Sequence, residues 1–261
     1  MRANIYDSIV NKKNYRKERE TMLRLVYVIL ISLPWVLFYM VKSHYVMNHM
    51  QNYSETYRYT MVRRMITIMK RNGRIKTDVY GKENLPKEGG YVMYSNHQGK
   101  YDVLGIISAH DAPCSFVIDD KRAELPIANE VTALLEGCRL DKSDLRKQMK
   151  SILDVVAQVK QGRRFVIFPE GGYDQNKNEL QDFMPGSFKC SMKSKTPIIP
   201  VAIKDSYKVF GVNSLKKVKT EVHFLPPIYY EDYGKMSTVQ IAEMVKNQID
   251  LVINGKEARI A

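Results

Sequence analysis

Short apolar runs alternate with helical stretches through the last two-thirds of this 261-residue chain. Continuous apolar runs of four to eight residues are typical of strands that are buried on both faces of a sheet. Strands that alternate with helices predict an α/β fold, in which helices cover the sheet. The runs are YVMYS (91–95), CSFVI (114–118), FVIF (165–168), PIIPVAI (197–203) and EVHFL (221–225).

Two helices are predicted from the spacing of their apolar residues. One runs from Asp144 to Lys160 before Gly162, and the other opens at Ser237, three residues before Gln240, in a capping-box pattern. We expect each helix to bury one apolar face against the sheet. These faces comprise Leu145, Met149, Ile152, Leu153, Val156 and Val159 in the first helix, and Ile241, Met244, Val245, Gln248, Ile249 and Val252 in the second.

Most of the net charge of +13 lies near the N-terminus. Residues 1–24 hold seven basic and three acidic residues, and residues 42–76 hold eight basic and one acidic, whereas residues 25–41 (LVYVILISLPWVLFYMV) are uncharged. Basic segments alone would suit nucleic acid or anionic lipid. Because these segments flank an apolar run, we predict an anionic membrane surface as the partner, and no nucleic acid.

The same region predicts a membrane anchor. Seventeen residues are at the short limit for crossing a bilayer, and Pro34 interrupts them, so a monotopic anchor is favoured over a span. Residues 57–74 place Tyr57, Met61, Met65, Ile68 and Met69 at helical spacing among basic residues, as in a helix lying on headgroups; packing on the chain's own domain is the alternative. We therefore expect a two-helix anchor in residues 1–76, and a second domain in residues 77–261 at the cytoplasmic face of the membrane.

Several common sites are absent from the sequence. It contains no G-x-G-x-x-G, Walker, H-E-x-x-H or G-x-S-x-G motif. The five histidines and three cysteines (Cys114, Cys138 and Cys190) have no paired metal-ligand spacing, and the isolated cysteines suit a reducing compartment. We expect neither a metal nor a cofactor.

The segment SNHQGKYD (95–102) follows the first predicted strand and contains a candidate catalytic pair. The carboxylate of Asp102 could accept a hydrogen bond from one imidazole nitrogen of His97 and leave the other free to take a proton. If His97 and Asp102 lay on one continuous helix, their side chains would point about 140° apart. A turn must therefore lie between them, and Gly99 permits one. The alternative is a helix N-cap at Asn96 beside a surface His–Asp pair.

The segment FVIFPEGGYDQN (165–176) follows another predicted strand. Glu170 precedes Gly171 and Gly172, whose backbone could approach a ligand closely and offer N–H groups to an anion. The alternative is an ordinary turn with a solvated glutamate.

Together with KENLPKEGGYVMYSNHQGKYD, KRAELPIANEVTALLEGCRLDKSD and a P-x-x-P strand, these motifs resemble the 1-acylglycerol-3-phosphate acyltransferase family of glycerolipid acyltransferases over residues 75–205. The resemblance implies a helix-covered mixed β-sheet, with a two-helix interfacial anchor in some bacterial members. It also implies acyl transfer from acyl-carrier protein or acyl-coenzyme A to lysophosphatidic acid, with His97 as general base and Asp102 orienting it. Glu170 and Gly171 match the motif associated with binding the acylglycerol phosphate.

The sequence departs from this family at two phosphate-binding positions. Gly172 and Tyr173 replace the usual Thr-Arg, and Lys142 stands where the second motif ends in arginine. Another lysophospholipid or glycerol 3-phosphate is therefore an alternative acceptor. A nucleic-acid-binding protein and a catalytically silent membrane-bound homologue are the competing functions. The predicted substrate-binding residues are Asn96, Lys100, Lys121, Lys142, Glu170, Gly171, Gly172 and Lys189.

Overall fold

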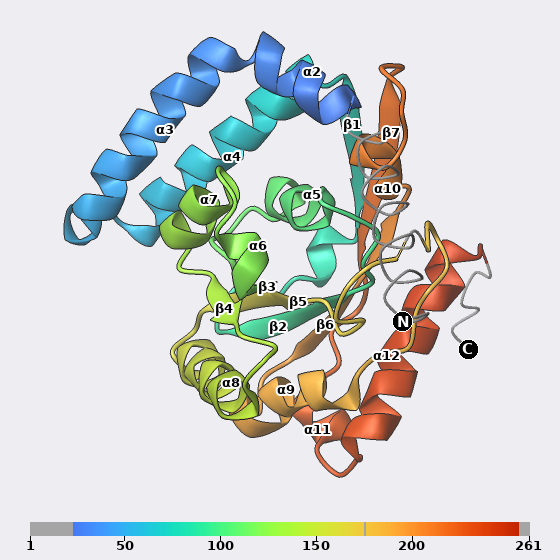
Figure 1. The fold of residues 1–261 in the computed structure, drawn as a ribbon. Helices are drawn as coiled ribbons and strands as arrows, with labels where there is room; N and C mark the ends of the chain where they lie inside the picture. The colour runs from blue at the N-terminus through green and yellow to red at the C-terminus, as the bar shows by residue number, and fades with distance from the viewer. Residues whose placement is uncertain (1–22, 175, 256–261) are drawn as a thin grey trace, which may run out of the picture.

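A computed structural model describes residues 23–174 and 176–255 of the chain, and shows one seven-stranded sheet with helices on both faces (Figure 1). The strand order is β1-β7-β6-β2-β5-β3-β4. The strands are β1 (Ile75–Tyr80), β2 (Tyr91–Ser95), β3 (Ser115–Asp119), β4 (Cys138–Leu140), β5 (Arg164–Ile167), β6 (Ile198–Lys204) and β7 (Val218–Phe224).

The five strands from β6 to β4 in this order run parallel, so their carboxyl ends meet at one edge of the sheet. β7 pairs antiparallel with β6, and β1 pairs parallel with β7, which makes the sheet mixed. All five predicted strands are present. β1 and β4 were not predicted, because β1 is mostly half-exposed and β4 has only three residues.

The two faces of the sheet bury alternate residues of each strand. In β2, Tyr91 and Met93 pack towards α4, α5 and α7, whereas Val92 and Tyr94 pack towards α8, α9 and α12. Figure 1 shows these two helical layers above and below the sheet. The helices are α2 (Leu23–Ile31), α3 (Leu33–Asn48), α4 (Glu55–Asn72), α5 (Asp102–Ala109), α6 (Asp120–Ala123), α7 (Ala128–Leu134), α8 (Leu145–Lys160), α9 (Lys189–Ser194), α10 (Tyr207–Phe210), α11 (Tyr230–Tyr233) and α12 (Thr238–Ile253).

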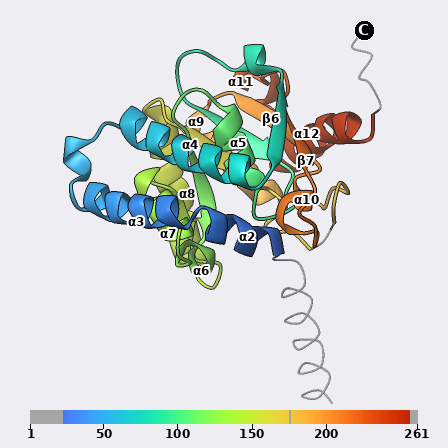
Figure 2. The same cartoon turned by 90° about the horizontal axis from the view of Figure 1, so that it is seen from above.

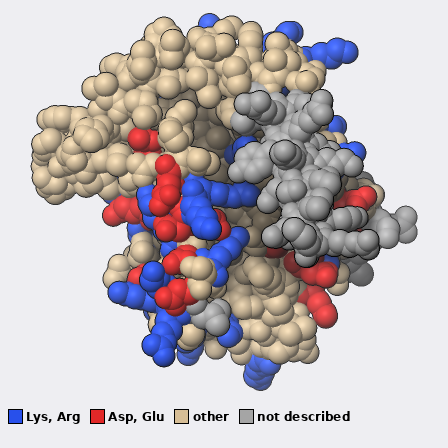
Figure 3. All heavy atoms as spheres, viewed as in Figure 1, with Lys and Arg blue, Asp and Glu red and all other residues tan. Residues whose placement is uncertain are grey.

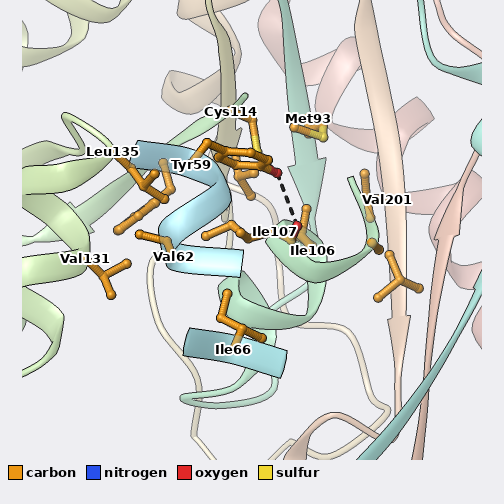
Figure 4. Packing of buried hydrophobic residues seen from close by; sticks show 14 of the residues in the cluster. Tyr59, Val62, Ile66, Met93, Ile106, Ile107, Cys114, Val131, Leu135 and Val201 are labelled. Atoms are coloured by element: carbon orange, nitrogen blue, oxygen red, sulfur yellow. Dashed lines mark hydrogen bonds between the residues drawn. The ribbon is translucent and has the colours of Figure 1, made fainter. Parts of the chain in front are cut away.

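Helix α4 packs into the core of the domain. Tyr59, Val62 and Ile66 are buried against residues of α5 and α7 (Figure 4), and the Tyr59 hydroxyl donates to the carbonyl oxygen of Ile107 at 3.2 Å. The sequence predicted that the apolar residues of segment 57–74 lie on lipid headgroups. This prediction is wrong for Met61, which is buried, and the alternative, packing of the helix on the chain's own domain, holds. The boundary predicted at residue 76 also falls inside β1 and separates α4 from its own core.

Helices α2 and α3 form a bent pair before α4. Pro34 lies in the first turn of α3, where the absent N–H costs no hydrogen bond, and the two helices meet at 79°. No single helix in the described residues is long and apolar enough to cross a bilayer, although this bent pair passes by length and composition. The pair exposes large apolar side chains, among them Leu30, Leu37, Phe38 and Val41. The part of the surface over α3 is almost free of charged side chains (Figure 3).

The two helices predicted from sequence form close to their expected bounds. Asp144 caps α8, and Ser237 and Gln240 form the predicted capping box of α12. The face predicted for α8 is partly wrong, because Met149 and Leu153 are exposed and Val155 is buried in their place. The charged segment of residues 1–22 lies outside the described residues.

Candidate functional site

The candidate site lies where β2, β5 and β6 end. Each strand is followed by an irregular loop that begins at the carboxyl edge of the parallel strands, with Asn96 and His97 after β2, Phe168 to Gly172 after β5, and Asp205 and Ser206 after β6. This edge is where open α/β sheets bind ligands. Segments from three parts of the sequence therefore converge at one place.

His97 and Asp102 form the predicted pair. The Nδ1 atom of His97 lies 2.6 Å from Oδ2 of Asp102, and a turn separates the residues, because α5 begins at Asp102. The carboxylate can only accept here, so Nδ1 carries the proton, and Nε2 has a lone pair that can take another. His97 is partly exposed, whereas Asp102 is fully buried. The pair thus has a solvent-accessible base and an inaccessible orienting carboxylate.

Hydrogen bonds to Asp102 close this turn. Its Oδ2 atom also accepts from the backbone N–H groups of Gln98 and Gly99, and its Oδ1 atom accepts from the hydroxyl of Ser206. Four donors thus satisfy a buried carboxylate and fix its orientation. Gly99 does not have a left-handed backbone, and a Cβ there would contact only Tyr207, so the turn depends on the carboxylate more than on a glycine.

Glu170 links the loop after β5 to the loop after β2. Its Oε1 atom accepts from the backbone N–H of His97 at 3.2 Å, and its Oε2 atom accepts from the Gln181 side chain at 2.9 Å. Burial raises the pKa of Glu170 to about 7, although these hydrogen bonds oppose the shift. The alternative of a solvated glutamate is therefore wrong, and a proton on this carboxyl group is available near neutral pH.

The two glycines after Glu170 have different roles. Gly171 has a φ of 72°, and a Cβ there would lie 2.5 Å from Cε of Met184. Its N–H donates to the carbonyl oxygen of Phe168 within the turn, and the predicted contact of this residue with a ligand stays a prediction. Gly172 has open space around it and no left-handed backbone. The sharp turn therefore requires glycine only at Gly171.

Aromatic rings hold the imidazole of His97 in place. Phe168 stacks on it at 4.3 Å between centroids, and Tyr173 meets it edge-on at 4.6 Å. The guanidinium of Arg122, on α6, lies 4.7 Å from the centroid of Tyr173. Arg122 thus brings a cation close to the site from α6, although the arginine expected at position 173 is absent.

The other predicted substrate-binding residues have varied positions. Asn96 is buried, and its amide group exchanges two hydrogen bonds with the backbone of Ile203, so it connects β2 to β6; its predicted contact with substrate stays a prediction. It does not cap α5, since Tyr101 holds that position. Gln98 is a second buried amide, and it bonds to Asn178 and Ile203.

The predicted lysines lie on the surface around the site. Lys142 donates to the carbonyl oxygen of Gly171 at 2.7 Å and pairs with Asp119, so it braces the loop that carries Glu170. Lys121 and Lys100 are exposed on α6 and on the turn before Asp102. Lys189 is exposed at the start of α9, and within the described segments no hydrogen bond or ion pair joins it to a residue of the site.

Sequence reasoning missed Ser206 and Arg122. Nothing near Ser206 in the sequence marks it, since its partner lies 104 residues away. Arg122 could have been noticed, because it lies in the second motif directly after Lys121.

The described residues contain no group of three or more side chains suited to bind a metal. Cys190 is buried, and burial raises the pKa of its thiol to about 12, as expected for a packed cysteine and not a nucleophile.

Comparison with known proteins points to one family. A family model described as Acyltransferase matches residues 76–204. The 1-acyl-sn-glycerol-3-phosphate acyltransferase of Borreliella burgdorferi is 25% identical over 195 residues, which cover 73% of this chain and 77% of that protein. Its counterpart in Salmonella typhimurium is 26% identical over 155 residues, which cover 59% of this chain and 63%, less than two thirds, of the relative.

A solved structure shares the fold. The 1-acyl-sn-glycerophosphate (LPA) acyltransferase from Thermotoga maritima superposes with a TM-score of 0.74, and the match covers 94% of this chain and 99% of the other at 18% identity. This likeness confirms the predicted fold class, a helix-covered mixed sheet preceded by N-terminal helices.

Proposed function

We propose that the chain is a member of the acyltransferase family and that it transfers a fatty acyl group from a thioester to the free hydroxyl of lysophosphatidic acid, giving phosphatidic acid. The observation that carries this proposal is the 2.6 Å contact between Nδ1 of His97 and Asp102 at the carboxyl edge of the sheet. It supports a base whose Nε2 atom is directed to substrate and whose tautomer is fixed.

The proposed step is direct transfer. Nε2 of His97 takes the proton from the acceptor hydroxyl as that oxygen attacks the thioester carbonyl carbon. The tetrahedral intermediate then expels the thiolate, which recovers the proton from the imidazolium. Asp102 stabilises the imidazolium that forms in between. No covalent enzyme intermediate is needed, and this agrees with the buried, protonated state of Cys190.

The acceptor phosphate needs positive charge close to this base. A phosphate monoester carries almost two negative charges, and guanidinium groups bind it through paired N–H donors. Arg122, held over Tyr173, supplies such a group from the second motif. We assign it the phosphate contact that the family's missing arginine would make. The predicted contacts of Lys100, Lys121 and Lys189 with substrate stay predictions, and Lys142 acts through Gly171.

A membrane surface is the proposed location of this chemistry. The exposed apolar side chains of α2 and α3 suit the interfacial layer of a bilayer, and the bent pair needs no full crossing. We propose that this pair anchors the enzyme to an anionic membrane and that the catalytic domain faces the cytoplasm. The donor is an acyl thioester of acyl-carrier protein or coenzyme A, and no further cofactor takes part in the proposed step.

Acyl transfer by the purified chain in vesicles tests the proposal. Acyl-carrier-protein and coenzyme A thioesters are each paired with lysophosphatidic acid, glycerol 3-phosphate and lysophosphatidylglycerol, with His97→Ala as control. Phosphatidic acid formed only by the wild type supports the proposal. Transfer only to another acceptor would assign a changed specificity to Gly172 and Tyr173, and no transfer from either donor would favour a silent homologue.

A further inference from the structure

A basic pocket lies on α4 and α5, apart from the residues of the candidate site. It has a volume of about 240 Å³, and all its lining side chains are polar. Three of them are cationic and three carry hydroxyl groups: Arg63, Arg64, Lys70, Thr60, Thr67 and Ser108. In Figure 2, α4 lies next to α5, the helix that contributes Ser108 to the lining.

The positive charge in this pocket is poorly compensated. Arg63 pairs with Asp111 at 3.2 Å, but Asp111 also accepts from Lys82 at 2.8 Å. Within residues 23–174 and 176–255, neither Arg64 nor Lys70 has a carboxylate at ion-pair distance. Lys70 instead donates to the hydroxyl of Ser108 at 3.2 Å.

The surroundings of Lys70 disfavour its charged form. Burial lowers its pKa, and the positive charge of Arg63 lowers it further. Both causes act against the cation, and an anion in the pocket would reverse the second of them. The hydroxyl groups of Thr67 and Ser108 already donate to backbone carbonyl oxygens, so the guanidinium and ammonium groups are the donors that the pocket offers to a phosphate.

We infer that this α4–α5 pocket binds the phosphate group of an anionic glycerolipid, as a headgroup site separate from the catalytic centre. A diffuse basic surface would need only charge. This pocket adds two guanidinium groups and a half-buried ammonium around a volume that a phosphate can enter, and Arg63 is held in place by its bonds to Asp111 and the carbonyl oxygen of Ser108. A free phosphate ion has the same chemistry, and the experiment separates the two sources.

Binding of the full-length protein to vesicles tests the inference, with phosphatidylcholine vesicles compared with and without phosphatidic acid. The variants are Arg64→Gln and the double variant Arg64→Gln with Lys70→Gln. Arg71→Gln is the matched control, because Arg71 is an exposed arginine of the same helix that does not line the pocket. We expect Arg64→Gln to weaken binding to the phosphatidic acid vesicles by about tenfold or more, and the control to change it by about fivefold or less.

Equal losses for Arg64→Gln and Arg71→Gln would overturn the inference, since only a diffuse basic surface gives that result. Titration calorimetry with inorganic phosphate forms the second arm. The double variant could abolish phosphate binding and leave vesicle binding unchanged. That result would assign the pocket to free phosphate and overturn the lipid source. Thermal unfolding checks that the variants are folded. Their acyl transfer in detergent is expected to be unchanged, so failure here is distinguishable from failure of the proposed catalysis.

Discussion

The hydroxyl of Ser206 donates a hydrogen bond to the carboxylate of Asp102, although 104 residues separate them in the chain. The loop after β6 thereby fixes the carboxylate that orients His97. The proposed catalytic pair is local in sequence, but its geometry depends on a residue that follows a much later strand. Ser206 is therefore a positioning residue for the proposed reaction.

Ser206→Ala is expected to lower kcat for acyl transfer by about tenfold, because Asp102 loses one of its four donors and holds the imidazole less firmly. KM for the acceptor should be unchanged, since Ser206 is buried away from solvent. Steady-state kinetics checks this split. Ser194→Ala removes another buried serine hydroxyl, one that has no part in the site, and should leave kcat unaltered. A rise in KM without a fall in kcat would contradict the positioning role.

His97→Ala is expected to lower kcat by at least about 10²-fold, because no other group can take the proton at that position. Circular dichroism should show an unchanged fold, since the His97 side chain is partly exposed. His223→Ala is the matched control, because His223 is a half-buried histidine on β7 that pairs with Glu221. Near wild-type activity of His97→Ala would refute the assignment of the base.

Glu170 makes stability depend on pH. Its folded-state pKa of about 7 lies above the ordinary value of 4.5, so the folded state holds the proton more tightly than the unfolded state does. The stabilisation is complete below about pH 4.5 and is lost as the pH rises through 7, a change of up to about 3 kcal/mol. Glu170→Gln should remove this part of the slope in denaturation midpoints measured between about pH 5 and pH 8. Glu179→Gln, at an exposed site nearby, should keep it, and identical slopes in wild type and Glu170→Gln would contradict the shift.

Gly171→Ala is expected to lower the free energy of unfolding by about 1–2 kcal/mol, because an alanine is strained in the left-handed region. Its Cβ would also displace the end of Met184. Gly172→Ala is the matched control and should have almost no effect, since its surroundings are open. Denaturant titration of both variants tests the difference, and equal stabilities would show that the turn does not require Gly171.

Arg122→Gln is expected to raise KM for lysophosphatidic acid by about tenfold and leave KM for the acyl donor unchanged. The reason is its place over Tyr173, next to His97. Lys121→Gln tests the neighbouring exposed cation that sequence reasoning favoured. A larger effect at Lys121 than at Arg122 would reverse the assignment of the phosphate contact.

The sequence alone determined the parts of this protein that depend on local patterns. The apolar runs gave five of the seven strands, Ser237 and Gln240 marked the start of α12, and the spacing from His97 to Asp102 identified the pair that the structure brings together. Such features were predictable because turn residues, caps and apolar periodicity act over a few residues.

Only the tertiary structure decided which surfaces are buried and which distant groups meet. The apolar side of α4 could serve a membrane or a core, and packing against α5 and α7 selected the core. Met149 fits the apolar pattern of α8, yet it is exposed, because the sheet covers only part of that helix. Ser206 and Arg122 reach the site through strand order and loop position, and hydrogen bonds between residues far apart in sequence leave no periodic signal in the chain.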